Sequence, residues 1–320
     1  MAWGRSTGRF SAEDNALVDL LGKLRARGYR FTTITPKSHA RVVARSGREQ
    51  ARTMEDALGW SLDFATHVLP DDVRNCLRRA DMIDRNGGVW RSRLRVSSLG
   101  DDLFIHSAYP TEADDAVFFG PDSYRFADVI AAELALQLPP LTPRVIDIGA
   151  GAGVGGLVVA RICPEAEILL SDVNPAALRF ARVNLAAAGV PATLVESNGL
   201  EQVEGRFDLA VINPPYIVDP DGPAYRDGGG NHGAQVALEL SAEAVDRLNP
   251  GGRLILYTGS PIIAGKDRLR ATLAQLATTY GASLSYREID PDVFGEELAR
   301  PVYREVDRIA LVAAVITAPS

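Results

Sequence analysis

The chain has 320 residues, of which 46% are hydrophobic and 23% are charged, and its formal net charge at pH 7 is −7. This composition is typical of a folded protein with room for two domains, and it excludes a disordered or fibrous chain. The apolar runs are shorter than the ~20 residues of a membrane span, and the first ten residues lack the apolar core of a signal peptide. We therefore predict a cytoplasmic protein without a membrane-spanning segment.

The charge is distributed unevenly along the chain. Residues 1–110 hold 18 Lys and Arg against 13 Asp and Glu, a net charge of +5, which leaves −12 for the remainder. A basic N-terminal third leaves a nucleic acid open as a partner. The two cysteines, Cys76 and Cys163, lie far apart without the spacing of metal ligands, so we predict no metal site.

The first 110 residues have the pattern of several helices followed by a short pair of strands. The predicted helices cover 11–28, 35–45, 54–65 and 70–82, and the predicted strands cover 89–97 and 102–107. Ser11 is a suitable N-cap for the first helix, and Asn86-Gly87-Gly88 is a turn signal before the strands. Helices followed by two strands resemble a winged-helix arrangement, so we predict a smaller N-terminal domain over 1–110 that recognises the substrate.

From residue 111 onward, strands and helices alternate. The predicted strands cover 144–149, 167–172, 192–197, 207–212, 253–258, 283–289 and 307–316, and the predicted helices cover 125–138, 154–162, 175–188, 234–248 and 265–279. This alternation predicts an α/β fold with a mostly parallel sheet and helices on both faces. The last two strands have no crossover helix between them, so we predict an antiparallel terminal strand in a second domain over 111–320.

A glycine-rich turn follows the first of these strands. Asp147 lies within the strand, and Gly149, Gly151 and Gly153 come directly after it. Glycines allow the backbone to turn sharply and to approach a ligand without an intervening Cβ atom. Asp172 ends the second strand about twenty residues later, where a carboxylate can hold the two hydroxyls of a ribose. The turn and the carboxylate together predict a cofactor that contains adenosine.

These two features do not by themselves separate a nicotinamide cofactor from S-adenosylmethionine. Asp147 favours S-adenosylmethionine, because a carboxylate at this position would repel a pyrophosphate but can order the turn and hold the ammonium group of a methionine. A polar run at the end of a later strand also favours it, since a methyl acceptor would lie there beside the cofactor.

That run is Asn213-Pro214-Pro215-Tyr216, directly after the strand over 207–212. The two prolines fix φ and remove two backbone donors, so the strand must stop there. The Asn213 side-chain oxygen and the Pro214 carbonyl can accept both hydrogens of a planar –NH2 group, and the Tyr216 ring can stack on it. We predict that these four residues are catalytic and that the methyl group passes directly to nitrogen.

In this order, the three motifs resemble class I S-adenosylmethionine-dependent methyltransferases, and more narrowly the methyltransferase small domain group. That group includes the glutamine methyltransferases of release factors and ribosomal proteins. The resemblance covers roughly 105–316 and implies a seven-stranded Rossmann-like sheet. It implies that Asp147 and the glycines border the methionine part of the cofactor, and that Asp172 and Asn174 lie on the ribose side.

The chain departs from this family pattern in two places. Ser197 and Asn198 follow the third strand, where the family often has an Asp over the adenine amino group, and we predict both as cofactor contacts. The connector over 119–124 lacks the Pro-Arg-Pro-Glu pattern of the glutamine enzymes. After the acceptor motif, a loop over 219–233 is rich in Gly and Asp, and Tyr225 and Arg226 are its candidates for substrate contact.

The predicted function is N-methylation of a planar amide or amino nitrogen, with a glutamine-type amide of a protein or peptide as the first candidate. The acceptor motif is shared with adenine-N6 and guanine-N2 methyltransferases. A nucleic-acid base, docked by the basic N-terminal third, is therefore the second interpretation. Methylation of a small molecule or peptide by a tailoring enzyme is the third interpretation. A nicotinamide-dependent oxidoreductase is the alternative from a different enzyme class. The sequence leaves the acceptor and the oligomeric state open.

Overall fold

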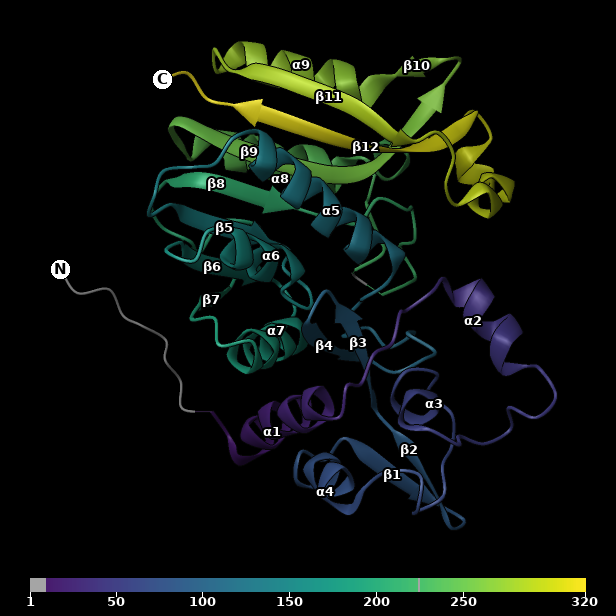
Figure 1. Ribbon diagram of the computed structural model, residues 1–320. Helices are drawn as coiled ribbons and strands as arrows, with labels where there is room; N and C mark the ends of the chain where they lie inside the picture. Colours follow the sequence, from purple (N-terminus) through teal and green to yellow (C-terminus); the bar gives the residue numbers. More distant parts are fainter. Residues whose placement is uncertain (1–9, 224) are drawn as a thin grey trace. The chain divides into compact units, whose positions relative to one another are not determined.

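The computed structural model describes residues 10–223 and 225–320 (Figure 1). They form two compact units, which are described separately. The first unit comprises the chain up to Arg125 with Gly151–Gly153 and Ala176–Thr193, and the second comprises Phe126–Ala150, Val154–Pro175 and Leu194–Ser320. The predicted boundary at residues 110 and 111 stays a prediction.

The first unit contains short helices and two hairpins. Its helices are α1 (Ala12–Ala26), α2 (Pro36–Val43), α3 (Met54–Leu58), α4 (Asp71–Arg79) and most of α7 (Pro175–Ala187), and its strands are β1 (Ile83–Asn86), β2 (Val89–Ser92), β3 (Leu94–Leu99) and β4 (Asp102–Ser107). As predicted, Ser11 caps α1, since its side chain accepts a hydrogen bond from the backbone N–H of Asp14 at 3.0 Å. The leucines of α1 are buried, and α1 packs against α4.

The hairpins correct one prediction, because the predicted strand over 89–97 is divided between β2 and β3. Ser92 bends the chain here: its hydroxyl donates to the carbonyl of Leu94 at 2.7 Å, a local bond that competes with strand pairing. As a result, β2 pairs with β1 and β3 pairs with β4, both antiparallel. The hairpin of β1 and β2 follows directly after α4. The winged-helix interpretation of this arrangement stays a prediction.

The second unit is built around one sheet. Its strands are β5 (Arg144–Ile148), β6 (Glu167–Asp172), β7 (Thr193–Glu196), β8 (Phe207–Ile212), β9 (Leu248–Ile263), β10 (Lys266–Asp267), β11 (Ser283–Asp290) and β12 (Arg308–Thr317). Its helices are α5 (Pro121–Leu136), α6 (Val154–Ile162), α8 (Gln235–Asp246) and α9 (Arg268–Thr279), with short 3-10 turns η1 (Asn231–Gly233), η2 (Gly295–Ala299) and η3 (Pro301–Tyr303).

The strand order is β11-β12-β9-β8-β5-β6-β7, with β10 added to the end of β9. β5 pairs in parallel with β6 and β8, and β8 pairs in parallel with β9. The C-terminal strand β12 runs antiparallel to both of its neighbours, β9 and β11. This confirms the predicted α/β fold, with a mostly parallel Rossmann-like sheet and an antiparallel terminal strand.

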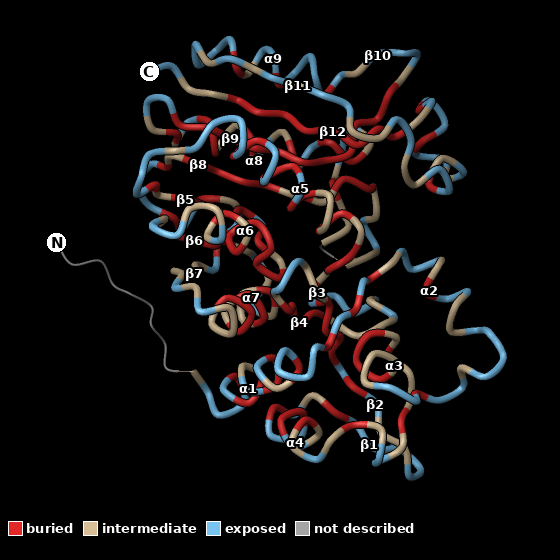
Figure 2. Tube along the Cα trace, in the orientation of Figure 1, coloured by how far each residue is buried: buried red, intermediate tan, exposed pale blue. Residues whose placement is uncertain are grey.

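The central strands are apolar on both faces because helices cover both. Ile148 of β5 belongs to a core cluster that includes residues of α8 and α9. Neighbouring residues point to the opposite face, where Asp147 contacts the first turn of α6 and Tyr257 contacts Phe126 of α5, with 6.3 Å between ring centroids. Figure 2 shows these strands as buried along most of their length.

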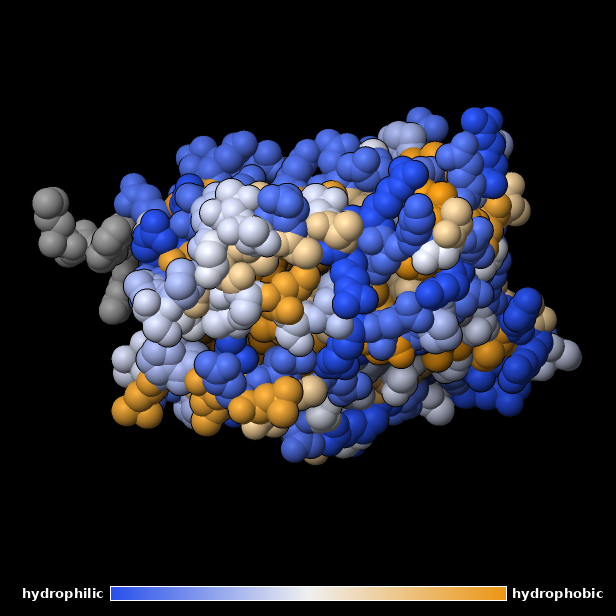
Figure 3. Space-filling model, turned by 90° about the horizontal axis from the view of Figure 1, so that it is seen from above, coloured by the Kyte–Doolittle hydropathy of each residue, from blue (hydrophilic) through white to orange (hydrophobic). Residues whose placement is uncertain are grey.

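The view in Figure 3 shows mainly hydrophilic residues, with hydrophobic ones in separate small groups. Within the described residues, no helix combines the length and the apolar character that crossing a membrane requires. The same residues contain no cluster of three His, Cys, Asp or Glu side chains suited to a metal ion.

Candidate active site

The sheet register of the second unit brings three predicted site residues into one row. Ile148 of β5 is aligned with Ser171 of β6 on one side and with Ile212 of β8 on the other. The next residues along these strands are Gly149, Asp172 and Asn213. Two strand spacings separate Asp172 from Asn213, roughly 10 Å, with Gly149 between them. The row lies at the carboxyl ends of parallel strands, where open α/β sheets bind ligands.

The glycine turn leaves open space above the end of β5. Gly149 is exposed, has a φ of +66°, and would have no atom within 4 Å of an added Cβ. Backbone N–H groups of Gly149 and Ala150 donate to the carbonyl of Ser171 at 2.8 and 3.0 Å, which ties the turn to β6. Gly151 and Gly153, grouped with the first unit, have φ values of +53° and +83°. A turn of this shape fits a ligand that approaches the backbone closely.

Asp147 is buried beneath this turn, with 1% of its surface exposed. Its carboxylate accepts a hydrogen bond from the N–H of Gly156 in the first turn of α6 at 2.8 Å. The pKa of Asp147 is raised to about 7, mainly by burial; the hydrogen bond from the N–H of Gly156 opposes this shift, the nearby carboxylate of Asp172 adds to it, and the N–H of Gly155 opposes it. The structure thus shows Asp147 joining β5 to the first turn of α6. Its predicted ordering of the glycine turn and its contact with a methionine ammonium stay predictions.

Asp172 is half-buried at the end of β6. One carboxylate oxygen accepts from the N–H of Asn174 at 2.9 Å, and its backbone carbonyl accepts from the N–H of Ser197 at 3.0 Å. These bonds fix the carboxylate at the strand end, as the predicted ribose contact requires. Asn174 is also half-buried and directly precedes α7.

Ser197 and Asn198 use their side chains within their own turn. The Ser197 hydroxyl is buried and accepts from the N–H of Gln202 at 3.0 Å, while the exposed Asn198 amide donates to Glu201 at 3.1 Å. The structure therefore gives both residues a local role. Their predicted contact with the cofactor stays a prediction.

Asn213 and Pro214 carry the two acceptor oxygens that the sequence predicts. Asn213 is half-buried and Pro214 is buried. In the part of the chain that the structure describes, the Asn213 side chain makes no hydrogen bond and no N–H donates to the Pro214 carbonyl. Within the described residues, these two oxygens keep their hydrogen-bonding capacity at the carboxyl end of β8, Asn213 in the row with Gly149 and Asp172 and Pro214 one residue beyond it.

The Tyr216 ring is enclosed by the protein. It is 7% exposed and lies against Gly259 of β9, so closely that a Cβ on this glycine would overlap the ring. Phe294, in the connector between β11 and β12, contacts it edge-on with 5.8 Å between ring centroids. These contacts fix the ring, whereas its predicted stacking on the methyl acceptor, like the role of Pro215, stays a prediction.

A ring of four charged side chains joins the loop after Tyr216 to the β11–β12 connector. Arg226 contacts Asp219 at 3.2 Å and Glu297 at 2.6 Å, and Arg300 contacts the same two carboxylates at 3.7 and 2.9 Å. Glu297 is 7% exposed. We call these four residues the charge ring. The structure thus places the predicted substrate residue Arg226 in an intramolecular network, and Tyr225 beside it is half-buried.

Sequence reasoning assigned no role to Asn184, a fully buried residue of α7 in the first unit. Its amide accepts from the N–H of Ile105 at 2.8 Å and donates to the carbonyls of Ile105 and Ala152 at 3.1 and 3.0 Å. It thereby holds the glycine turn to β4. The sequence does indicate such a role in one way, because Asn184 is a polar residue within the apolar face of a predicted helix, and buried polar groups need hydrogen-bond partners.

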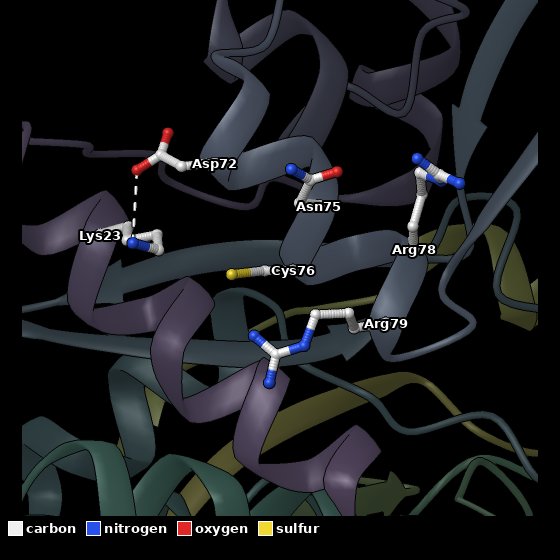
Figure 4. A pocket seen from close by; sticks show the side chains of 6 residues that line it. All are labelled: Lys23, Asp72, Asn75, Cys76, Arg78 and Arg79. Atoms are coloured by element: carbon white, nitrogen blue, oxygen red, sulfur yellow. Dashed lines mark ion pairs between the residues drawn. The ribbon is translucent and has the colours of Figure 1, made fainter.

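The first unit also has a cavity of about 550 Å³ that contains none of the predicted site residues. Its lining residues come from α1 and α4: Lys23, Asp72, Asn75, Cys76, Arg78 and Arg79 (Figure 4). Lys23 and Asp72 form an ion pair of 3.3 Å within it. The two arginines of the lining, Arg78 and Arg79, are exposed.

A family model described as methyltransferase small domain matches residues 120–280, half of the chain. The chain belongs to the methyltransferase small domain family. This confirms the predicted family, and with it the prediction of a methyltransferase domain that uses S-adenosylmethionine (AdoMet).

Two curated relatives differ in the substrates that their names state. The release factor glutamine methyltransferase of Deinococcus radiodurans is 36% identical over 168 residues, covering 48% of this chain and 56% of that protein. The ribosomal RNA small subunit methyltransferase C of Escherichia coli is 37% identical over 127 residues, covering 37% of this chain and 33% of that protein. The chain thus spans about half the length of the first relative and a third of the second.

Solved structures give a weaker likeness. The T. thermophilus 16S rRNA N2 G1207 methyltransferase in complex with AdoMet and guanosine has a TM-score of 0.47 and is 18% identical, over 81% of this chain and 64% of that chain.

Proposed function

We propose that this chain is an S-adenosylmethionine-dependent N-methyltransferase that acts on a planar –NH2 group. The observation that carries the proposal is the row of Gly149, Asp172 and Asn213 at one sheet edge, with the Asn213 side chain and the Pro214 carbonyl unengaged within the described residues. This row would place a cofactor cradle at the ends of β5 and β6 beside two hydrogen-bond acceptors at the end of β8.

The acceptor oxygens address the main chemical difficulty of this reaction. The nitrogen of an amide or ring-attached amino group is a poor nucleophile because its lone pair is delocalised into the planar group. Asn213 and the Pro214 carbonyl would accept its two hydrogens, which raises electron density on nitrogen and orients the lone pair. Such positioning and electrostatic stabilisation can lower a barrier by several kcal/mol. When bound, the cofactor supplies the electrophilic methyl group.

The cofactor side of the site would act through shape and charge. Gly149 would let the ligand approach the backbone, and the Asp172 carboxylate would accept hydrogen bonds from the ribose hydroxyls. Asp147 would hold the turn through the N–H groups of α6 and favour an ammonium group nearby. Asn174 would support the ribose side.

A glutamine-type amide of a protein is one carrier of the methyl-accepting nitrogen, and the D. radiodurans relative supports it by its name. The exocyclic amino group of an RNA base is the second candidate. The E. coli relative supports it by name, and so do exposed, unpaired arginines within the described part of the first unit.

The test separates binding of the cofactor from transfer of its methyl group. Asn213→Ala should bind S-adenosylmethionine with unchanged affinity in isothermal titration, yet transfer labelled methyl to the acceptor fraction of a cell extract at least about tenfold more slowly. Asn75→Ala, the same change on an exposed position of α4, is the matched control and should keep both properties. Equal transfer by the Asn213 variant and the wild type would remove the proposed role of Asn213.

A second readout identifies the acceptor. Label from the wild-type reaction would be counted in the protein, RNA, DNA and small-molecule fractions of the extract. Label in protein that is released as methylated glutamine supports the amide, and label in RNA supports the base. Tight binding of NAD without binding of S-adenosylmethionine would overturn the proposed function as a whole.

A further inference from the structure

The segment from Lys37 to Arg52 carries a net positive charge, and Arg48 within it is paired with Asp56 at 2.8 Å. It contains four arginines and one lysine but a single acid, Glu49, which gives a net charge of +4. Arg41, Arg45 and Arg52 are exposed, and within the described residues none of these three forms an ion pair or a side-chain hydrogen bond. We call Arg41, Arg45 and Arg52, together with Lys37 on the same side of α2, the arginine face.

Several other exposed arginines of the first unit are held by carboxylates, although Arg78 and Arg85 are exposed without an ion pair among the described residues. The pairs are Arg27–Asp72, Arg30–Asp101, Arg79–Asp19, Arg91–Asp63 and Arg93–Asp84. A guanidinium that already binds a carboxylate has fewer N–H groups to offer to another anion. Arg41, Arg45 and Arg52 thus combine unused guanidinium donors with a dense positive charge in one segment.

The helix α2, which carries Lys37 and Arg41 of the face, is fixed from its other side. His39 is 1% exposed, its ring stacks on Tyr109 with 4.0 Å between centroids, and its Nε2 lies 3.1 Å from the carbonyl of Trp60. At about 100° per residue, Arg41 lies roughly 200° around α2 from His39, so the guanidinium points away from this anchor. Burial lowers the pKa of His39 to about 4, which leaves the anchor neutral at pH 7.

We infer that the arginine face binds the phosphate backbone of RNA. Guanidinium groups match phosphate oxygens in geometry and charge, and three of them, on the anchored helix α2 and in the segment directly after it, suit a polyanion whose charges repeat along its length. Residues 111–320 have a net charge of −12 and would repel such a polyanion, so docking falls to the basic N-terminal third. The inference rests on the proposed function for the role of the RNA as methyl acceptor, and it deepens that function by naming the carrier.

The test compares two triple variants with the same change of charge. R41Q/R45Q/R52Q removes the arginine face, whereas R30Q/R79Q/R91Q removes three exposed arginines that are already paired. Binding of a short fluorescein-labelled RNA hairpin would be followed by anisotropy in a series of KCl concentrations, without cofactor. The first variant should lose at least about tenfold in affinity, and the slope of log affinity against log salt should become shallower by about 2 to 3. The second should bind like the wild type.

Several outcomes would overturn the inference. Equal losses of RNA affinity in the two variants would mean that binding depends on net charge alone and not on the arginine face. A labelled poly-glutamate peptide that binds as tightly as the RNA, and is lost in the same variant, would identify an acidic polypeptide as the partner instead. R41K/R45K/R52K keeps the charge but not the guanidinium groups, so it separates charge from guanidinium contacts. The melting temperatures of all variants show whether each one is folded.

RNA binding without any methyl transfer would contradict the proposed function and leave this inference standing.

Discussion

At the ends of β5 and β6, the candidate site is shaped by backbone groups, whereas at the end of β8 it is enclosed by charged and aromatic side chains. The first region, the cofactor side, depends on Gly149, on backbone hydrogen bonds to Ser171 and on the buried Asp147. The second region, the acceptor side, depends on the charge ring and on Phe294 against Tyr216.

This difference indicates which part of the site tolerates sequence change and which part does not. A backbone cradle recognises a ligand by shape, and few substitutions alter it without distorting the sheet. Side-chain contacts between two loops can change with the sequence of either loop, so the same acceptor motif can serve different substrates. The comparison predicts that perturbing the cofactor side mainly changes folding and cofactor affinity, and that perturbing the acceptor side mainly changes handling of the acceptor.

The largest expected effect is the pH dependence that Asp147 gives to the cofactor side. Its pKa is raised by burial to about 7, so between about pH 4 and 7 the folded state keeps a proton that the unfolded state has lost. The free energy of unfolding should therefore fall as pH rises through this range, by up to about 1.4 kcal/mol per pH unit, and then level off. Asp147→Asn keeps an acceptor for the N–H of Gly156 but cannot titrate.

The measurement is urea unfolding of wild type and Asp147→Asn across this pH range. The difference between the two free energies isolates Asp147 from the other titrating groups, and it should change steadily up to about pH 7. A difference that stays constant with pH would mean that the buried carboxylate is ionised throughout.

The next effect tests the close packing beneath the turn. A Cβ on Gly155 would lie 2.8 Å from a carboxylate oxygen of Asp147. Gly155→Ala should therefore lower the free energy of unfolding by about 1–3 kcal/mol and weaken S-adenosylmethionine binding in calorimetry. Gly22→Ala in α1 is the matched control, because no atom lies within 4 Å of its added Cβ and alanine is the better helix former. The control should gain about 0.5–1 kcal/mol, and a gain at Gly155 as well would contradict the packing argument.

The cofactor side was the more predictable region because its determinants are local in sequence. Asp147 and Gly149 lie in one strand and its turn, and Asp172 ends the next strand, so the alternation of strands and helices was sufficient to align them. Asn213 joined this row for the same reason, since parallel strands end at one edge. The sheet itself followed from apolar strands of ordinary length, including the antiparallel β12.

The acceptor side was less predictable because its partners are distant in sequence. Glu297 lies 71 residues from Arg226, and periodicity carries no information about pairs of charges in irregular loops. Asn184 reaches Ile105 from 79 residues away for a similar reason. The sequence therefore predicts Arg226 as a substrate contact without its ion pairs in the charge ring, and the substrate contact stays a prediction. The predicted strand over 89–97 failed for the opposite reason, because a single local hydrogen bond of Ser92 accompanies its division into two strands.

The smallest expected effect concerns Glu297, and it tests the acceptor side directly. Glu297→Gln removes the most buried carboxylate of the charge ring and leaves Asp219 with both arginines. Because Arg226 and Arg300 are more than a third exposed, solvent screens the lost attraction, and the free energy of unfolding should fall by only about 1 kcal/mol. The effect on local mobility should be greater than the effect on global stability, because the charge ring joins the loop after Tyr216 to the β11–β12 connector.

Hydrogen exchange followed by mass spectrometry would locate that effect. In Glu297→Gln, exchange should increase over 217–228 and 291–303, the KM for the acceptor should rise, and the affinity for S-adenosylmethionine should stay constant. Glu288→Gln, which removes one exposed pair with Arg308 at 2.9 Å, is the matched control and should change none of these. Added salt should raise exchange in the wild-type loop towards the variant's level, because screening weakens the same ion pairs. If exchange over the glycine turn rose equally, the two sides would unfold as one unit, and the proposed independence of cofactor and acceptor recognition would be lost.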